Sequence, residues 1–107
     1  MSTAEQKDGP RACCLNQNNL EERATYPGGA GTSGSWYYCA GCDREFLLAH
    51  MDFDESCMDP MHYELWRLLP AGEKAPETAT NLSDYIMQHK PYYARNVAAG
   101  GEFRLSV

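Results

Sequence analysis

The chain has few basic residues and no long apolar run. Nine lysines and arginines stand against fifteen acidic residues in 107 positions, which gives a formal net charge of −6. The basic residues are scattered, whereas nucleic-acid affinity rests largely on clustered Lys and Arg side chains that neutralise phosphates. No apolar stretch approaches the ~20 residues that a membrane-spanning helix needs. The composition therefore disfavours a general nucleic-acid binder and an association with membranes.

Large apolar side chains are also scarce, with three Phe and two Trp, so we expect a small core. A chain of this size often needs a metal, a disulfide or a partner to become well ordered. Residues 1–11 are polar, unlike a secretory signal, and we expect them to form a flexible lead in a cytoplasmic protein. Five cysteines cannot all pair within one chain, and a reducing compartment disfavours disulfides. These features favour metal–thiolate chemistry.

We expect one small α+β domain, in which a zinc-ribbon-like β-hairpin module is joined to one or two short helices. Its expected parts are a ribbon over 12–56, a helical part over 57–91 and a C-terminal strand or tail over 92–107, all within a single zinc-binding domain over 12–107.

Strands are expected on both sides of the Cys-x-x-Cys pair, Cys39 and Cys42. The aromatic sequence SWYYC, 35–39, suits a pleated surface, and REFLLAHMDF, 44–53, is the expected returning strand. The Gly- and Ser-rich residues 27–35 predict a hairpin tip or linker. Near the end of the chain, Phe103, Leu105 and Val107 alternate as in an edge strand.

Two helices are expected in the second half of the chain. Apolar residues recur at helical spacing over 60–69, where Asp59 is a candidate cap and Pro60 suits the first helical position. The members of that apolar stripe are Met61, Leu65, Leu68 and Leu69. A shorter helix is predicted over 82–90, capped by Asn81 or Ser83 and ended by Pro91.

Cys39 and Cys42 form one half of a possible zinc site, because zinc takes four ligands in a tetrahedron, usually from two short turns. Cys13 and Cys14 are one candidate for the other half. Adjacent side chains on an extended strand point to opposite faces, so this pair reaches one metal only through a turn. The alternative second half is Cys57 with His62, at the start of the expected helix, and a mixed set such as Cys13 or Cys14 with Cys57 is also open.

The sequences CCLNQNNLEER and CAGCDR resemble those of small zinc-ribbon-like proteins of phages and prokaryotes. In that pattern a Cys-Cys pair is followed by Asn-Leu-Glu-x-Arg and later by Cys-x-x-Cys with an Arg. The matching positions are Cys13, Cys14, Asn19, Leu20, Glu21, Arg23, Cys39, Cys42 and Arg44. The family often has a His shortly after the second cysteine pair, where Phe46 stands here. The resemblance implies a Zn²⁺ site made by Cys13, Cys14, Cys39 and Cys42.

No enzyme is expected, since four thiolates would leave zinc no open coordination position. Thiol redox chemistry at Cys39 and Cys42 is a lesser alternative, because no βαβ pattern surrounds the pair. The His62-Tyr-Glu64 triplet matches the His-x-Glu of zinc deaminases, but it follows the Cys-x-x-Cys pair instead of preceding it. His50 and His89 are expected to be ordinary surface or core histidines.

The expected function is recognition by a metal-stabilised module. We expect a protein partner, bound by an accessory or regulatory protein, and the resemblance adds a phage or prokaryotic setting. The motivation is the acidic balance and a set of aromatics expected at the surface: Trp36, Tyr37, Tyr38, Tyr92 and Tyr93. The alternative is nucleic-acid binding through the zinc ribbon by Arg23, Arg44 and a platform of tyrosines, because aromatic stacking suits single strands.

Overall fold

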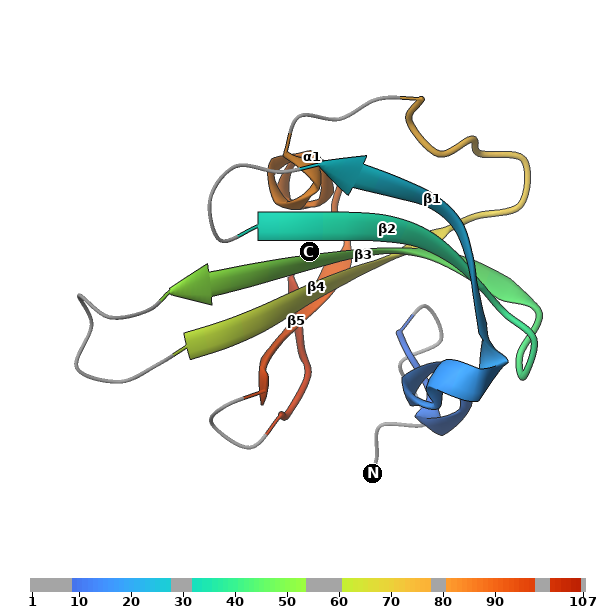
Figure 1. Ribbon diagram of the computed structural model, residues 1–107, viewed down its shortest axis with the longest axis horizontal. Helices are drawn as coiled ribbons and strands as arrows, with labels where there is room; N and C mark the ends of the chain where they lie inside the picture. The colour runs from blue at the N-terminus through green and yellow to red at the C-terminus, as the bar shows by residue number, and fades with distance from the viewer. Residues whose placement is uncertain (1–8, 28–31, 54–60, 78–80, 98–100, 107) are drawn as a thin grey trace.

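The protein folds as one antiparallel sheet with a single α-helix among the residues that the structure describes (Figure 1). The structure is a computed structural model, and it describes residues 9–27, 32–53, 61–77, 81–97 and 101–106. The sheet has six strands in the order β1-β2-β3-β4-β5-β6, a meander in which each strand pairs with the next one in the sequence. The fold class is thus α+β and mostly β.

The elements follow one another in a simple order. Two short 3-10 segments come first, η2 (Ala12–Leu15) and η3 (Gln17–Asn19). The strands are β1 (Leu20–Pro27), β2 (Thr32–Cys39), β3 (Arg44–Phe53), β4 (Met61–Leu69), β5 (Tyr92–Asn96) and β6 (Arg104–Ser106), and the helix α1 (Leu82–Gln88) lies between β4 and β5. None of the described helices is long and apolar enough to cross a membrane.

Strand β3 is buried on both faces, which explains its nearly continuous apolar sequence. Leu47 and Ala49 point to the face that α1 covers, and Phe46 and Leu48 point to the opposite face. All four side chains are at most 5% exposed. Since side chains alternate along a strand, such a run predicts a strand with both faces covered.

Helix α1 covers one face of the sheet. Asn81 caps it, because its side-chain oxygen accepts hydrogen bonds from the backbone N–H groups of Ser83 and Asp84. Leu82 and Ile86 then pack into the core of that face. A Cβ on Gly34 would lie 2.5 Å from the side chain of Leu82, so only glycine allows β2 and the helix this close. The predicted second helix and its cap are confirmed.

The opposite face carries a second core, which includes Phe46, Trp66, Tyr93 and two cysteines. The rings of Phe46 and Trp66 meet edge to face with centroids 5.6 Å apart. Figure 1 shows the 3-10 segments at the end of the sheet where β1 begins and where β2 turns into β3. The cysteines that are candidate metal ligands therefore lie at one end of this second core.

The prediction of a helix over 60–69 is wrong, because Met61–Leu69 forms strand β4. Met61, Leu65 and Leu69 are four apart, a spacing that fits a helix face and also every second position of one strand face. The pairing with β3 favours the strand over the helix, since β4 runs antiparallel beside β3 from Glu45↔Leu69 to Phe53↔Met61. Asp59 and Pro60, the expected helix start, lie outside the described residues.

The loop predicted over the Gly- and Ser-rich residues 27–35 is shorter in the structure, because strands extend into it from both ends. Pro27 belongs to β1, and Thr32–Ser35 belongs to β2, where it pairs with Leu48–Met51 of β3. Residues 28–31 lie outside the described residues. The strands predicted at 44–53 and at the C-terminal end are confirmed, and β6 pairs with β5 at the end of the strand order.

Candidate metal centre

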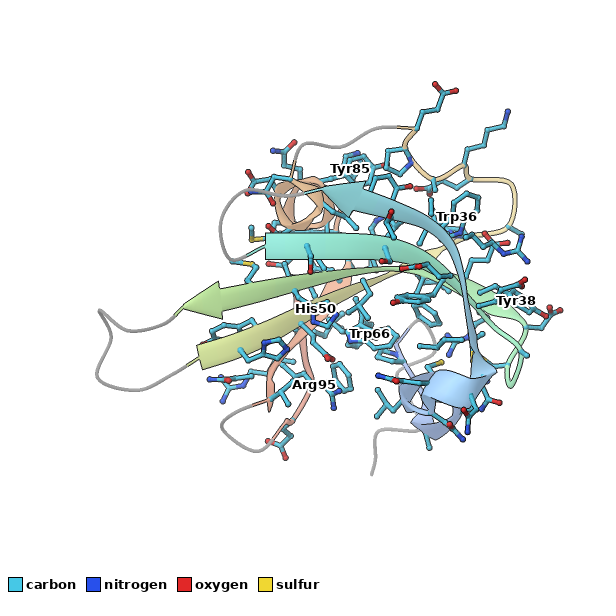
Figure 2. The ribbon with its side chains drawn as sticks, viewed as in Figure 1. Trp36, Tyr38, His50, Trp66, Tyr85 and Arg95 are labelled. Atoms are coloured by element: carbon cyan, nitrogen blue, oxygen red, sulfur yellow. The ribbon has the colours of Figure 1, made fainter. Side chains whose placement is uncertain are left out.

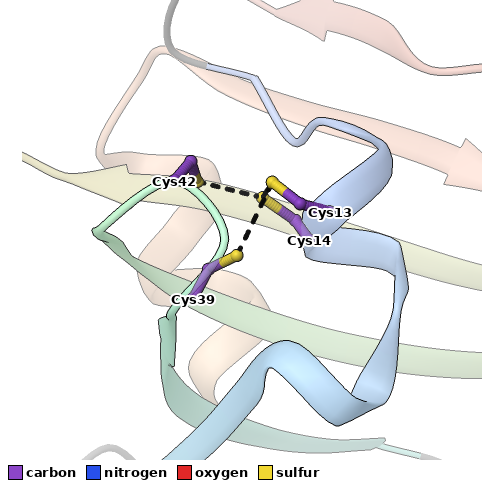
Figure 3. A group of neighbouring side chains, drawn as sticks. All are labelled: Cys13, Cys14, Cys39 and Cys42. Carbon is purple, nitrogen blue, oxygen red and sulfur yellow. Dashed lines mark hydrogen bonds between the residues drawn. The ribbon is translucent and has the colours of Figure 1, made fainter.

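Two segments far apart in the sequence bring four cysteines together (Figure 3). Cys13 and Cys14 lie in the 3-10 segment η2, and Cys39 and Cys42 lie at the turn that joins β2 to β3. All four are free thiols. Cys14 and Cys39 are fully buried. The cluster could therefore hold a metal ion that is largely shielded from water.

The distances between the sulfur atoms suit a tetrahedral site. Cys14 Sγ lies 3.5 Å from Cys42 Sγ and 4.0 Å from Cys13 Sγ. Cys39 Sγ lies 3.8 Å from Cys13 Sγ, and all four sulfurs lie within 4.8 Å of one another. A tetrahedron with metal–sulfur bonds of ~2.3 Å has edges of about 3.8 Å. Only small side-chain shifts separate this cluster from a four-thiolate metal site.

The 3-10 conformation of η2 removes the difficulty that adjacent cysteines pose. In a 3-10 turn consecutive side chains are about 120° apart, instead of pointing to opposite faces as in a strand. The turn is closed by the N–H groups of Cys14 and Leu15, which both donate to the carbonyl of Arg11. Cys13 and Cys14 can thus face the same point.

The β2–β3 turn places the other two sulfurs. The N–H of Asp43 donates to the carbonyl of Cys39 at 2.8 Å, and Asp43 itself has a left-handed φ of 58°. Asp tolerates this conformation better than most residues. A Cβ on Gly41 would lie only 2.5 Å from Cys13 Cβ. Glycine is therefore required where the turn meets η2.

Asn19 connects the two halves of the cluster through its backbone and its side chain. Its Nδ2 donates to the carbonyl of Cys13 at 3.0 Å, and its carbonyl accepts from the N–H of Ala40 at 2.8 Å. One residue thus fixes both η2 and the β2–β3 turn. Hydrogen bonds of this kind around a metal site orient the ligands.

Arg44 supplies positive charge beside the sulfurs. Its Nε donates to Cys42 Sγ at 3.2 Å, and one of its terminal nitrogens lies 3.9 Å from Cys14 Sγ and 2.9 Å from the carbonyl of Gly9. The guanidinium group also stacks over the ring of Phe46, 4.8 Å from its centroid. Because four thiolates and a divalent metal carry a net negative charge, this cation stabilises the loaded site.

The cysteines differ in acidity when no metal is bound. Burial raises the pKa of Cys13 and of Cys14. Burial opposes ionisation of Cys42 as well, but the hydrogen bond from Arg44 and those from the neighbouring thiols outweigh it and lower its pKa to about 7. Cys42 is therefore more readily converted than Cys13 or Cys14 to the thiolate that binds metals.

The alternative ligand set does not assemble among the described residues. His62 lies with His50 and Glu64 in a separate group, and Cys57 lies outside the described part of the chain. The redox alternative also lacks its usual context. Cys39 and Cys42 flank a turn between strands, whereas a low-pKa redox pair typically sits at a helix N-terminus.

The aromatics expected at the surface are largely core residues. Tyr93 is 4% exposed, and the others are only partly exposed. Trp36 packs against the core on the face that α1 covers. Tyr38 donates a hydrogen bond to Asp43 and has the guanidinium of Arg23 over its ring. The prediction that these aromatic side chains are exposed is therefore wrong for Tyr93. The other four side chains are only partly exposed.

No protein-family model, no curated protein and no solved structure matches this chain. The resemblance to zinc-ribbon-like proteins accordingly stays a prediction. Two of its positions have structural roles that the sequence alone did not indicate: Asn19 joins the two cysteine segments, and Arg44 contacts their sulfurs. Their membership of the resembling pattern was the sequence signal for these two positions, and it assigns them no role.

Proposed function

We propose that the chain is a zinc-stabilised binding module whose metal is held by Cys13, Cys14, Cys39 and Cys42. The arrangement of the four sulfurs at nearly tetrahedral spacing carries the proposal. Zinc suits it best among divalent metals, because a buried tetrahedral S₄ set is typical of structural zinc. The metal would join η2 to the sheet and cover the open end of a small second core.

Such a closed site supports a binding role. Four thiolates leave no coordination position for a substrate, so the metal contributes folding free energy instead of catalysis. We propose a protein partner, in keeping with the net charge of −6. A cytoplasmic, regulatory role in a phage or prokaryote rests on the resemblance alone.

The C-terminal hairpin offers the best candidate surface for that partner. Leu105 is 47% exposed and stands opposite Tyr93 in the pairing of β5 with β6. Paired residues share a face, so Leu105 lies on the side of the sheet that carries the cysteines. β6 also ends the strand order, and an edge strand can pair with an extended segment of another protein.

Affinity capture with the zinc-loaded protein tests this role. Leu105→Glu is expected to lose the partner, and Arg104→Glu is the control, because it adds the same carboxylate on the other face of β6. Capture that survives high salt supports an apolar protein interface. Equal capture by both variants would contradict the proposed surface, and no specific partner at all would contradict the proposed role.

The contacts of Arg44 in the structure weaken the nucleic-acid alternative, which relies on Arg23 and Arg44. Arg44 is engaged by Cys42, Gly9 and the ring of Phe46, and Arg23 lies 3.7 Å from the carboxylate of Glu21. Retardation of single-stranded DNA or RNA at low salt, steeply weakened by added salt, would restore that alternative.

A further inference from the structure

A second group of candidate ligands lies across the middle strands on the cysteine-bearing face. His50 of β3 stands opposite Glu64 of β4, and Glu64 stands opposite Arg95 of β5. His62 is two residues before Glu64 on β4 and so shares its face. Figure 2 shows His50, Trp66 and Arg95 close together on this part of the sheet.

The ligand atoms of the two histidines and the glutamate converge. His50 Nδ1 lies 3.4 Å from His62 Nε2 and 4.0 Å from Glu64 Oε2, and all three ligand atoms lie within 4.8 Å of one another. Ligands about 2.1 Å from one metal ion are separated by roughly 3.0 to 3.4 Å, depending on the geometry. The histidine pair already has that spacing, and a small rotation of the carboxylate would complete the set.

The carboxylate is held in place by two donors on one oxygen. Arg95 Nε donates to Glu64 Oε1 at 2.8 Å, and Trp66 Nε1 donates to the same oxygen at 3.0 Å. Arg95 is itself stacked over the ring of Phe103 at 4.8 Å. Oε1 is thus occupied, and Oε2 is the oxygen on the side of His50. Donors that orient a ligating carboxylate in this way are typical of metal sites.

We propose that His50, His62 and Glu64 form a second metal site, which binds a divalent ion of the zinc type and keeps a coordination position open. Two imidazoles and one carboxylate suit Zn²⁺ and similar first-row ions, and three protein ligands leave a place for water or a ligand. This site is separate from the four-cysteine centre, and it goes beyond the structural role proposed there.

The surroundings indicate what the open position could accept. His50 and Glu64 line a cavity of about 320 Å³ whose wall also includes Gln17, Arg95, Leu20, Tyr37 and Trp66. The side chains of His50 and Glu64 are 31% and 13% exposed, so a small ligand can reach them. A small ligand with one metal-binding donor atom and further polar groups would fit this mixed lining of polar and aromatic side chains.

Cobalt titration tests the proposal, because Co²⁺ bound to thiolates absorbs differently from Co²⁺ bound only by nitrogen and oxygen. With the cysteines first filled with zinc, the wild-type protein is expected to bind one further Co²⁺ without a thiolate charge-transfer band. His62→Ala and Glu64→Gln should lose this second equivalent while retaining the zinc. Gln can still accept the hydrogen bonds from Arg95 and Trp66, which keeps the fold unchanged.

His89→Ala is the matched control, since His89 is the third histidine of the chain and lies outside the group, with its Nδ1 2.7 Å from the carbonyl of Tyr85. It should bind the second Co²⁺ as the wild type does. Undiminished binding in both His62→Ala and Glu64→Gln, or no second equivalent in the wild type, would overturn the proposal. The His–His contact would then be a hydrogen bond beside an ion pair. Failure of the four-cysteine centre would be visible separately, as loss of the zinc.

Discussion

Arg44 donates from Nε to the sulfur of Cys42 at 3.2 Å while its guanidinium group covers the ring of Phe46. The contact places a positive charge beside a thiol whose pKa is lowered to about 7. The side chain of Arg44 therefore connects the cysteine cluster to the apolar core on the same face of the sheet. The Arg that follows the Cys-x-x-Cys pair in the sequence is part of the site.

Replacement of this arginine should weaken metal binding. In Arg44→Gln the charge that offsets the thiolates is lost, and we expect zinc affinity to fall roughly 10- to 100-fold, as for other groups that support metal ligands. Competition with a chromophoric chelator measures the change. Arg104→Gln, an exposed arginine of β6, should leave the affinity unaltered. Equal affinities in both variants would show that Arg44 serves packing alone.

The acidity of Cys42 predicts how the metal-free protein reacts with iodoacetamide. Thiolates are the reactive species, so Cys42 should be alkylated first, with a half-maximal rate near pH 7, its pKa being lowered from the usual 9.0. The ionised thiol favours the folded chain fully above pH 9.0, and this contribution is lost as the pH falls through about 7. Alkylation that rises only near pH 9 would contradict the proposed effect of Arg44.

Gly41 gives a second test of the metal centre. Gly41→Ala puts a Cβ 2.5 Å from Cys13 Cβ, so η2 or the turn must move and zinc affinity should fall by at least tenfold. Gly72→Ala is the comparison, because Gly72 has a φ of +91° and no neighbour within 4 Å. That variant should lose about 1 kcal/mol of folding stability through strain without a change in zinc affinity. Similar zinc affinities for the two variants would argue against the close approach.

The cap of α1 should matter for stability and not for the metal. Asn81→Ala removes the oxygen that accepts from the N–H groups of Ser83 and Asp84, and the expected cost is about 1 kcal/mol of unfolding free energy. Urea unfolding of the zinc-loaded protein measures it. Asn18→Ala, at an exposed position of η3, should cost much less.

Local sequence patterns predicted several strands and one helix, but they could not predict which strands pair or which side chains meet across them. The apolar run of β3 and the Asn81 cap depend on neighbouring residues, and both expectations were confirmed. The helix predicted over 60–69 concealed the second ligand group. Residues two apart, such as His62 and Glu64, do not face each other on a helix but share a face on a strand. Their approach to His50 depends on the pairing of β3 with β4.

The same limit applies at the cysteines. Cys39 and Cys42 are recognisable as a pair from their spacing, but the orientation of Cys13 and Cys14 depends on the 3-10 turn η2. Backbone hydrogen bonds to the carbonyl of Arg11 close that turn, and Asn19 joins it to the β2–β3 turn through Cys13 and Ala40. The contact between Asn19 and Ala40 is a tertiary contact that no short sequence pattern specifies.

The most direct test of the account is the zinc content of the purified protein after removal of weakly bound metal, with Cys14→Ser measured alongside. We expect one tightly held zinc per chain in the wild type, none in Cys14→Ser, and a large fall in the free energy of unfolding when the zinc is chelated. A wild-type protein that holds no zinc and unfolds cooperatively without it would contradict a metal-stabilised fold, as would a Cys14→Ser variant that keeps its zinc.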